Sequence, residues 1–170
     1  YPPDREAQLL GLLGLYTGRD DSLRHALHRA SQETGVLQDR DLFFAWYNKG
    51  SSLAALGEYA PAAAAYDQAF AIYQDLPEEQ RPWRMGWYQT GPYQAYYHSG
   101  RYQDVIQLAN TTLSVFAEPP LEESLYWRGL AKQASADLDG AIADFKLAVD
   151  LNLTTLYGQA ELERLGVIYP

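Results

Sequence analysis

The chain has 170 residues, with 13 Lys and Arg against 22 Asp and Glu, a formal net charge of −9 and no cysteine. The missing cysteine excludes a disulfide, a thiolate metal site and a cysteine nucleophile, and the acidic charge disfavours nucleic acid as a partner. The longest apolar runs fall short of the roughly 20 residues that span a bilayer, so we expect a soluble chain without membrane insertion.

The chain begins Tyr1-Pro2-Pro3, without an initiator Met or a basic and apolar leader. We therefore expect it to be a segment of a longer protein or a processed chain. Its composition alone does not specify a cellular compartment, because exported domains can also lack cysteine.

One pattern recurs along the chain. Gly11, Gly50 and Gly129 are each followed, twelve residues later, by an apolar residue: Leu23, Ala62 and Ala141. Between these positions apolar and small residues follow the three-and-four spacing of amphipathic helices. A period of thirty-odd residues indicates helix pairs that bury their apolar faces by stacking on one another.

In chain order, we predict helix pairs at about residues 4–37, 43–76, 86–119 and 122–155, and a capping helix at 156–168. Glycine should reverse the chain within the first three pairs, where a positive φ carries no steric cost for it. These glycines are Gly18, Gly57 and Gly100, and Ala136 takes the equivalent place in the fourth pair. Pro92 should lie inside the first helix of the third pair and cause a kink or a wider crossing there.

The second pair carries the most complete motif, consisting of Trp46, Gly50, Leu53, Gly57, Tyr59, Ala62, Tyr66 and Ala69. In these residues the chain resembles the tetratricopeptide repeat family, and the other three copies match it in part. The resemblance implies an all-α fold: one domain over residues 1–170, built as a right-handed superhelical solenoid of about four helix pairs.

The resemblance also implies where a ligand would lie, because the first helix of each pair lines the concave surface in this family. The register points to aromatic, amide and hydroxyl side chains, a combination that suits an extended peptide or a sugar chain. The predicted groove residues are Tyr16, Phe44, Tyr47, Asn48, Ser51, Trp87, Gln94, Tyr97, His98, Tyr126 and Trp127. About half of the aromatic residues are equally expected to fill gaps between helices.

No pattern indicates an enzyme. His25 and His28 are three residues apart on a predicted helix, but neither an HExxH phrase nor a third ligand accompanies them. We therefore predict no catalytic residue, no metal and no cofactor. A clamp for a C-terminal carboxylate is also disfavoured, because Asn48 is nearly alone among the required residues and the chain is acidic.

Our main hypothesis is a non-catalytic scaffold that binds a protein or peptide partner in the aromatic groove. The phrases PWRMGWYQTGPYQAYYHSGRYQDVI and SLYWRGLAKQASADLDGAIADF also resemble repeat arrays that follow papain-like cysteine peptidase domains in certain bacteria. That resemblance implies an alternative, an accessory module of a secreted peptidase that binds substrate or cell-wall glycan outside the cytoplasm. Homo-oligomerisation, through the convex face or the end of the stack, is a third possibility.

Overall fold

A computed structural model describes residues 6–82, 84–85, 89–115, 121–151 and 156–169. Within these residues the chain is all-helical and has no β-strand, so the all-α prediction is confirmed for them. The chain divides into two compact units, residues 1–99 and 100–170. The prediction of one domain with the repeat boundaries given above stays a prediction.

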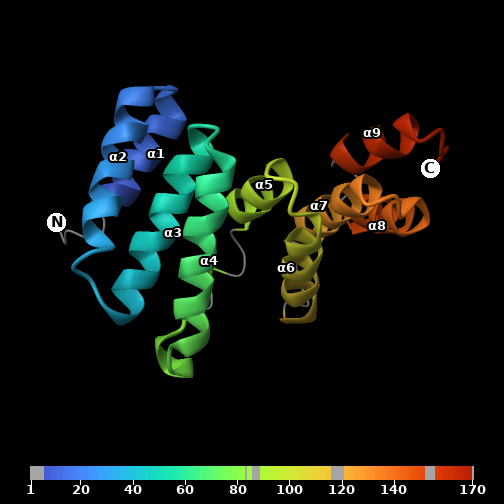
Figure 1. Cartoon of the computed structure of the whole chain (residues 1–170). Helices are drawn as coiled ribbons and strands as arrows, with labels where there is room; N and C mark the ends of the chain where they lie inside the picture. The colour runs from blue at the N-terminus through green and yellow to red at the C-terminus, as the bar shows by residue number, and fades with distance from the viewer. Residues whose placement is uncertain (1–5, 83, 86–88, 116–120, 152–155, 170) are drawn as a thin grey trace. The chain divides into compact units, whose positions relative to one another are not determined.

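Unit 1 packs each of its helices against its neighbours in sequence (Figure 1). In addition, α3 contacts both α1 and α5, so the three odd-numbered helices of the unit lie in a row. The elements are α1 (Glu6–Thr17), α2 (Asp20–Glu33), α3 (Asp39–Ala55), α4 (Tyr59–Asp75), a 3-10 turn η2 (Glu78–Gln80) and α5 (Thr90–His98).

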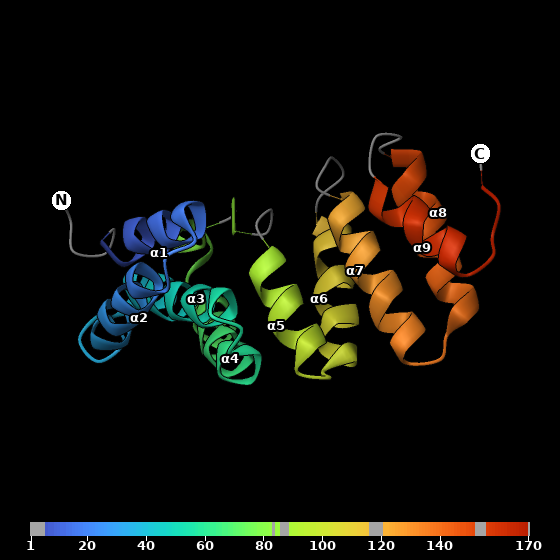
Figure 2. The ribbon, with the colours of Figure 1, turned by 90° about the horizontal axis from the view of Figure 1, so that it is seen from above.

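Unit 2 contains α6 (Tyr102–Val115), α7 (Leu121–Ala134), α8 (Leu138–Leu151) and α9 (Leu156–Arg164). Consecutive helices contact one another, and α7 lies between α6 and α8 (Figure 2). One cluster of the unit's core consists of Ala141, Phe145, Val149 and Leu162, which are all buried. Tyr126, Leu165 and Tyr169 are among the partly buried side chains that pack against it.

Two helix boundaries differ from the sequence-based expectation. Pro92 is the third residue of α5, which begins at Thr90, so it stands at the start of a helix and not inside one. The N–H groups of the first helical turn have no partner within the helix, so proline causes no loss there. Helix α9 ends at Arg164 because Gly166, at φ 71°, turns the chain and the Val167 N–H donates to the Leu162 carbonyl, 2.9 Å away.

Glycines allow the closest contacts between helices. A Cβ atom on Gly50 would lie 2.9 Å from the Tyr66 ring, and one on Gly129 would lie 2.5 Å from the Phe145 ring. In the first pair, Gly11 has room for a Cβ, whose nearest neighbours would be 3.9 Å away. The close contact there is made by Gly14, where a Cβ would lie 2.6 Å from the Leu23 side chain. The bulkier Leu23 is therefore accommodated by a second glycine, which the repeat pattern does not predict.

We predict that Gly129→Ala lowers the free energy of unfolding by about 1–3 kcal/mol, because its methyl group would overlap a fully buried ring. The matched control is Gly11→Ala, at the same place in the repeat pattern. There the methyl group makes only ordinary contacts, so stability should be unchanged or rise by up to about 1 kcal/mol. Urea denaturation measures both variants, and equal losses of stability in the two would contradict the packing argument.

The helix-to-helix turns have positive φ angles at Gly18 (63°), Gly57 (77°), Gly100 (78°) and also at Ala136 (65°). A residue with a side chain adopts this left-handed conformation at a cost of about 1–2 kcal/mol, which glycine does not incur. We therefore predict that Ala136→Gly stabilises the chain by about 1 kcal/mol. The control Ala64→Gly, at an exposed position inside α4, should destabilise it by about as much. Thermal unfolding of the two variants distinguishes the effects by their opposite signs.

Candidate functional site

In unit 1 the candidate site lies on α3 and α5, which contact one another. Phe44, Asn48 and Ser51 follow a helical spacing along α3 and are partly exposed. On α5, Gln94 and Tyr97 are partly exposed and His98 is exposed. We call these six residues the α3–α5 face. Six of the predicted groove residues therefore lie at partly or fully exposed positions on two helices that contact one another, and the groove itself stays a prediction.

The amide side chains are the distinctive polar groups of the α3–α5 face. Within the described residues, neither the Asn48 nor the Gln94 side chain makes a hydrogen bond or an ion pair. Each amide carries a carbonyl acceptor and an NH₂ donor, the same two functions that a peptide group carries. These amides are thus placed to bind a ligand backbone without breaking an internal hydrogen bond.

Ser51 connects the α3–α5 face to the core beneath it. Its hydroxyl donates to the Tyr47 carbonyl at 3.0 Å and lies 3.1 Å from the Tyr66 hydroxyl. Since the Ser51 proton is used on the carbonyl, the Tyr66 hydroxyl donates to Ser51 Oγ. Tyr66 is fully buried, and burial raises the pKa of its hydroxyl, so this ring stays neutral. Gly91 of α5 lies directly against the same hydroxyl, where a Cβ would overlap it.

Tyr47 differs from the sequence-based expectation that it lines an open groove. Only 7% of its surface is exposed. Its ring centroid lies 5.7 Å from that of Phe43 and 5.1 Å from that of Tyr66, so it is a packing residue between α3 and α4. A Tyr47→Ala variant would open a cavity and is a poor probe of ligand binding.

Two other predicted residues cannot be placed. The side chain of Tyr16 and the whole of Trp87 lie outside the described residues. At the C-terminal end of α5, the exposed His98 ring packs against Tyr59 of α4, tilted by 31° with centroids 4.5 Å apart, and Tyr97 meets His98 edge to face at 5.4 Å. These contacts attach the end of α5 to α4 and give this part of the surface a fixed aromatic edge.

Tyr126 and Trp127, the last two predicted residues, belong to unit 2 and are partly exposed. The Tyr126 ring lies 5.8 Å from the Trp127 ring, 6.2 Å from the buried Phe145 ring and 5.7 Å from the Tyr157 ring of α9. Tyr157 is 68% exposed. The predicted groove does not include Tyr157, because residues 156–168 are expected to form only a capping helix. The signal for it is the Tyr157-Gly158 pair, in which a large ring stands next to a glycine inside a helix.

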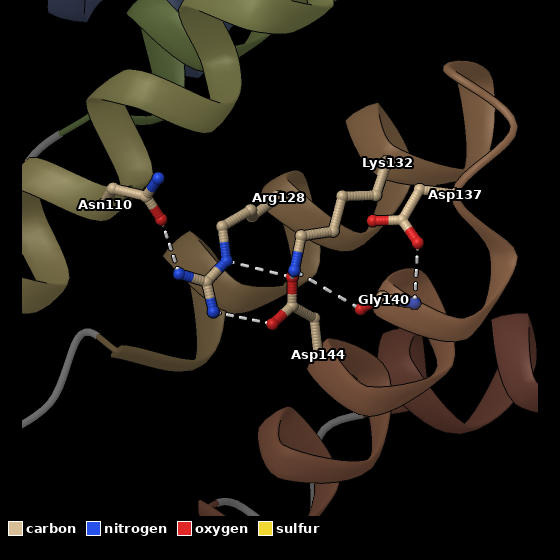
Figure 3. Close-up of polar contacts among 6 residues, drawn as sticks. All are labelled: Asn110, Arg128, Lys132, Asp137, Gly140 and Asp144. Carbon is tan, nitrogen blue, oxygen red and sulfur yellow. Dashed lines mark hydrogen bonds and ion pairs between the residues drawn. The ribbon is translucent and has the colours of Figure 1, made fainter.

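A polar network connects three helices of unit 2 (Figure 3). Arg128 of α7 donates two hydrogen bonds to the Asp144 carboxylate of α8, at 2.9 and 2.6 Å, and one to Asn110 of α6 at 2.6 Å. Lys132 Nζ lies 2.8 Å from Asp144 Oδ2, the oxygen that also accepts from Arg128 Nε. Asp144 is buried, so the two cations compensate its desolvation. Every charge in this network has a partner within the chain, which is typical of a structural role.

Two features are absent from the described residues, a cluster of potential metal ligands and a helix that could span a membrane. No group of three or more His, Cys, Asp or Glu side chains could hold a metal ion there. His25 and His28 are exposed on α2, and His28 lies 3.1 Å from the Gln32 amide. Among the same residues, no helix combines the length and apolar character that crossing a bilayer requires.

Comparison with known proteins adds no functional assignment. No model of a protein family matches the chain, and no curated protein matches it either.

The Asp144 network should contribute much more to the free energy of unfolding than an exposed ion pair does. Asp144→Ala leaves Arg128 and Lys132, whose side chains are 18% and 21% exposed, without their shared carboxylate, and should cost about 3 kcal/mol of unfolding free energy. Asp104→Ala removes the partner of Arg101 in a pair that is 36% and 41% exposed, and should cost less than about 1 kcal/mol. Chemical denaturation of both variants tests this, and similar losses would show that the Asp144 network contributes no more than a surface pair.

Proposed function

We propose that the chain is a non-catalytic interaction module of tetratricopeptide type, whose helix pairs form a superhelical solenoid, and that its α3–α5 face binds an extended peptide segment of a partner protein. The observation that carries the proposal is the pair of side-chain amides, Asn48 and Gln94, without internal partners on two adjacent helices. An amide that is solvated in the free protein can exchange water for a peptide group at little cost.

The aromatic residues of the same face supply contact area. Phe44 lies one turn before Asn48 on α3, and Tyr97 lies one turn after Gln94 on α5. Aromatic side chains bury a large surface and have few rotatable bonds. They can therefore contact a peptide with little loss of side-chain entropy. In the proposed complex, the aromatic rings contact the side chains of the peptide and the two amides hydrogen-bond to its backbone.

The charge on these helices narrows the class of ligand. Helix α5 has no Lys, Arg, Asp or Glu, and α3 has two acids and two bases: Asp39, Asp41, Arg40 and Lys49. The guanidinium of Arg40 lies over the Phe44 ring, with 5.6 Å between Cζ and the ring centroid. The face therefore carries little net charge within a chain of net charge −9. We infer that the bound segment is mainly uncharged and that its affinity depends weakly on salt.

The experiment is a selection of short random peptides displayed on phage against the full chain, followed by fluorescence anisotropy of the selected sequences. The Asn48→Ala/Gln94→Ala double variant should weaken their binding tenfold or more, about 1.4 kcal/mol, because each lost amide leaves ligand backbone groups unpaired. Its thermal unfolding should stay close to that of the parent chain, because neither amide makes an internal hydrogen bond within the described residues.

The matched control is Gln68→Ala/Gln107→Ala, which removes two exposed amides from α4 and α6. Binding of the selected peptides to this control should be unchanged. The proposal is wrong if no peptide is enriched, or if the enriched peptides bind the Asn48→Ala/Gln94→Ala variant as tightly as the parent chain.

A further inference from the structure

Unit 2 has an aromatic corner of its own, formed by Tyr126 of α7 and Tyr157 of α9. The two ring planes are inclined by 43° with centroids 5.7 Å apart, and Trp127 extends the surface beside Tyr126. The two rings therefore contact one another at a tilt and are not stacked flat.

The corner is held in place from below. Tyr126 packs against the core of unit 2, and its ring lies 6.2 Å from the fully buried Phe145. Gly158, the neighbour of Tyr157, is buried against α8, where a Cβ would lie 3.1 Å from the Phe145 carbonyl. Helix α9 is therefore tightly seated while Tyr157 itself remains 68% exposed. A large, exposed ring on a fixed helix is suited to contact something outside the unit.

Negative charge lies beside the corner. Glu122 and Glu123, in the first turn of α7, precede Tyr126 and Trp127 by one helical turn and are partly exposed. The face of an aromatic ring is itself the negative part of its quadrupole, so rings and carboxylates attract the same ligand charge. The net charge of −9 on the chain also attracts cationic ligands over a longer range.

Elsewhere in the chain, lysine ammonium groups lie over aromatic rings of the same chain. Lys49 lies 4.7 Å from the centroid of the Trp46 ring, and Lys146 lies 5.3 Å from that of Tyr169. Within the described residues, no Lys or Arg occupies the Tyr157 ring in this way. The exposed face of Tyr157 thus remains available for a cation from another molecule.

We propose that the Tyr126–Tyr157 corner binds an organic cation, the ammonium or guanidinium group of a Lys or Arg side chain presented by a partner protein. This inference is independent of the α3–α5 face, because it rests on different residues in a different unit. A sugar ring is the main competing ligand, since its C–H groups also stack on aromatic faces, but a sugar does not exploit the carboxylates through charge. The experiment separates the two.

The full chain is titrated with the methylamides of N-acetyl-lysine and N-acetyl-arginine, and the corner is followed by NMR through the backbone amides of α9 and the Trp127 indole. A matched neutral probe is N-acetyl-norleucine methylamide, and N-acetylglucosamine is the sugar probe. We expect saturable shifts with the two cations, affinity that falls as salt is raised, and at least about threefold weaker binding of the neutral probe. Equal binding of norleucine, preferential binding of the sugar, or the absence of shifts with the cations would each overturn the proposal.

Two variants locate the effect. Tyr157→Leu keeps an apolar side chain but removes the π face, and Glu123→Gln keeps the shape but removes the charge. Each should weaken cation binding about threefold or more. Tyr157→Leu should leave thermal unfolding close to that of the parent chain, because Tyr157 is largely exposed. The control Glu163→Gln removes an exposed acid from α9 and should have a smaller effect. Cation binding unaffected by both corner variants would also contradict the proposal.

Discussion

The close contact between glycine backbones and aromatic rings is the constraint on which the rest of the structure depends. Tyr66 is contacted from two sides, by Gly50 of α3 along its ring and by Gly91 of α5 at its hydroxyl, and any Cβ at either position would overlap it. Because one buried ring fixes the spacing of α3, α4 and α5 together, the helices that carry the candidate surface cannot separate without losing core packing. Gly129 and Phe145 have the same relation in unit 2.

The same constraint explains how much of the fold the sequence predicts. Recurring glycines at a fixed spacing from Ala62 and Ala141 indicate helix pairs, and the all-helical structure of the described residues agrees with this. The repeat pattern does not predict the positions where a neighbouring residue provides the required space or backbone conformation. Gly14 makes room for Leu23 while Gly11 does not need to be glycine, and Ala136 adopts the turn conformation that glycine adopts elsewhere. A repeat register specifies where a small residue is expected, but not which of two nearby residues makes the contact.

The candidate site is less predictable for a geometric reason. Helical spacing places Phe44, Tyr47, Asn48 and Ser51 within one broad sector of α3, yet Phe44, Asn48 and Ser51 are partly exposed while Tyr47 is buried. The boundary between surface and core passes through this sector. Its position depends on where the aromatic rings of α4 pack, and the residue spacing within α3 cannot predict that. Tyr157 is absent from the predicted groove for a different reason: a terminal helix is expected only to cap the last repeat, so its pattern gives no cue to an exposed ring.

The polar groups of the two units help to separate structural positions from candidate binding positions. Asp144 is buried, and Arg128 and Lys132 compensate its negative charge and hydrogen-bond to it within the chain. These side chains therefore need no external partner. The amides of Asn48 and Gln94 hydrogen-bond to no other described residue and remain solvated. Both positions are partly exposed, so other side chains could stand there. The proposed binding role therefore rests on these two amides and not on the Asp144 network.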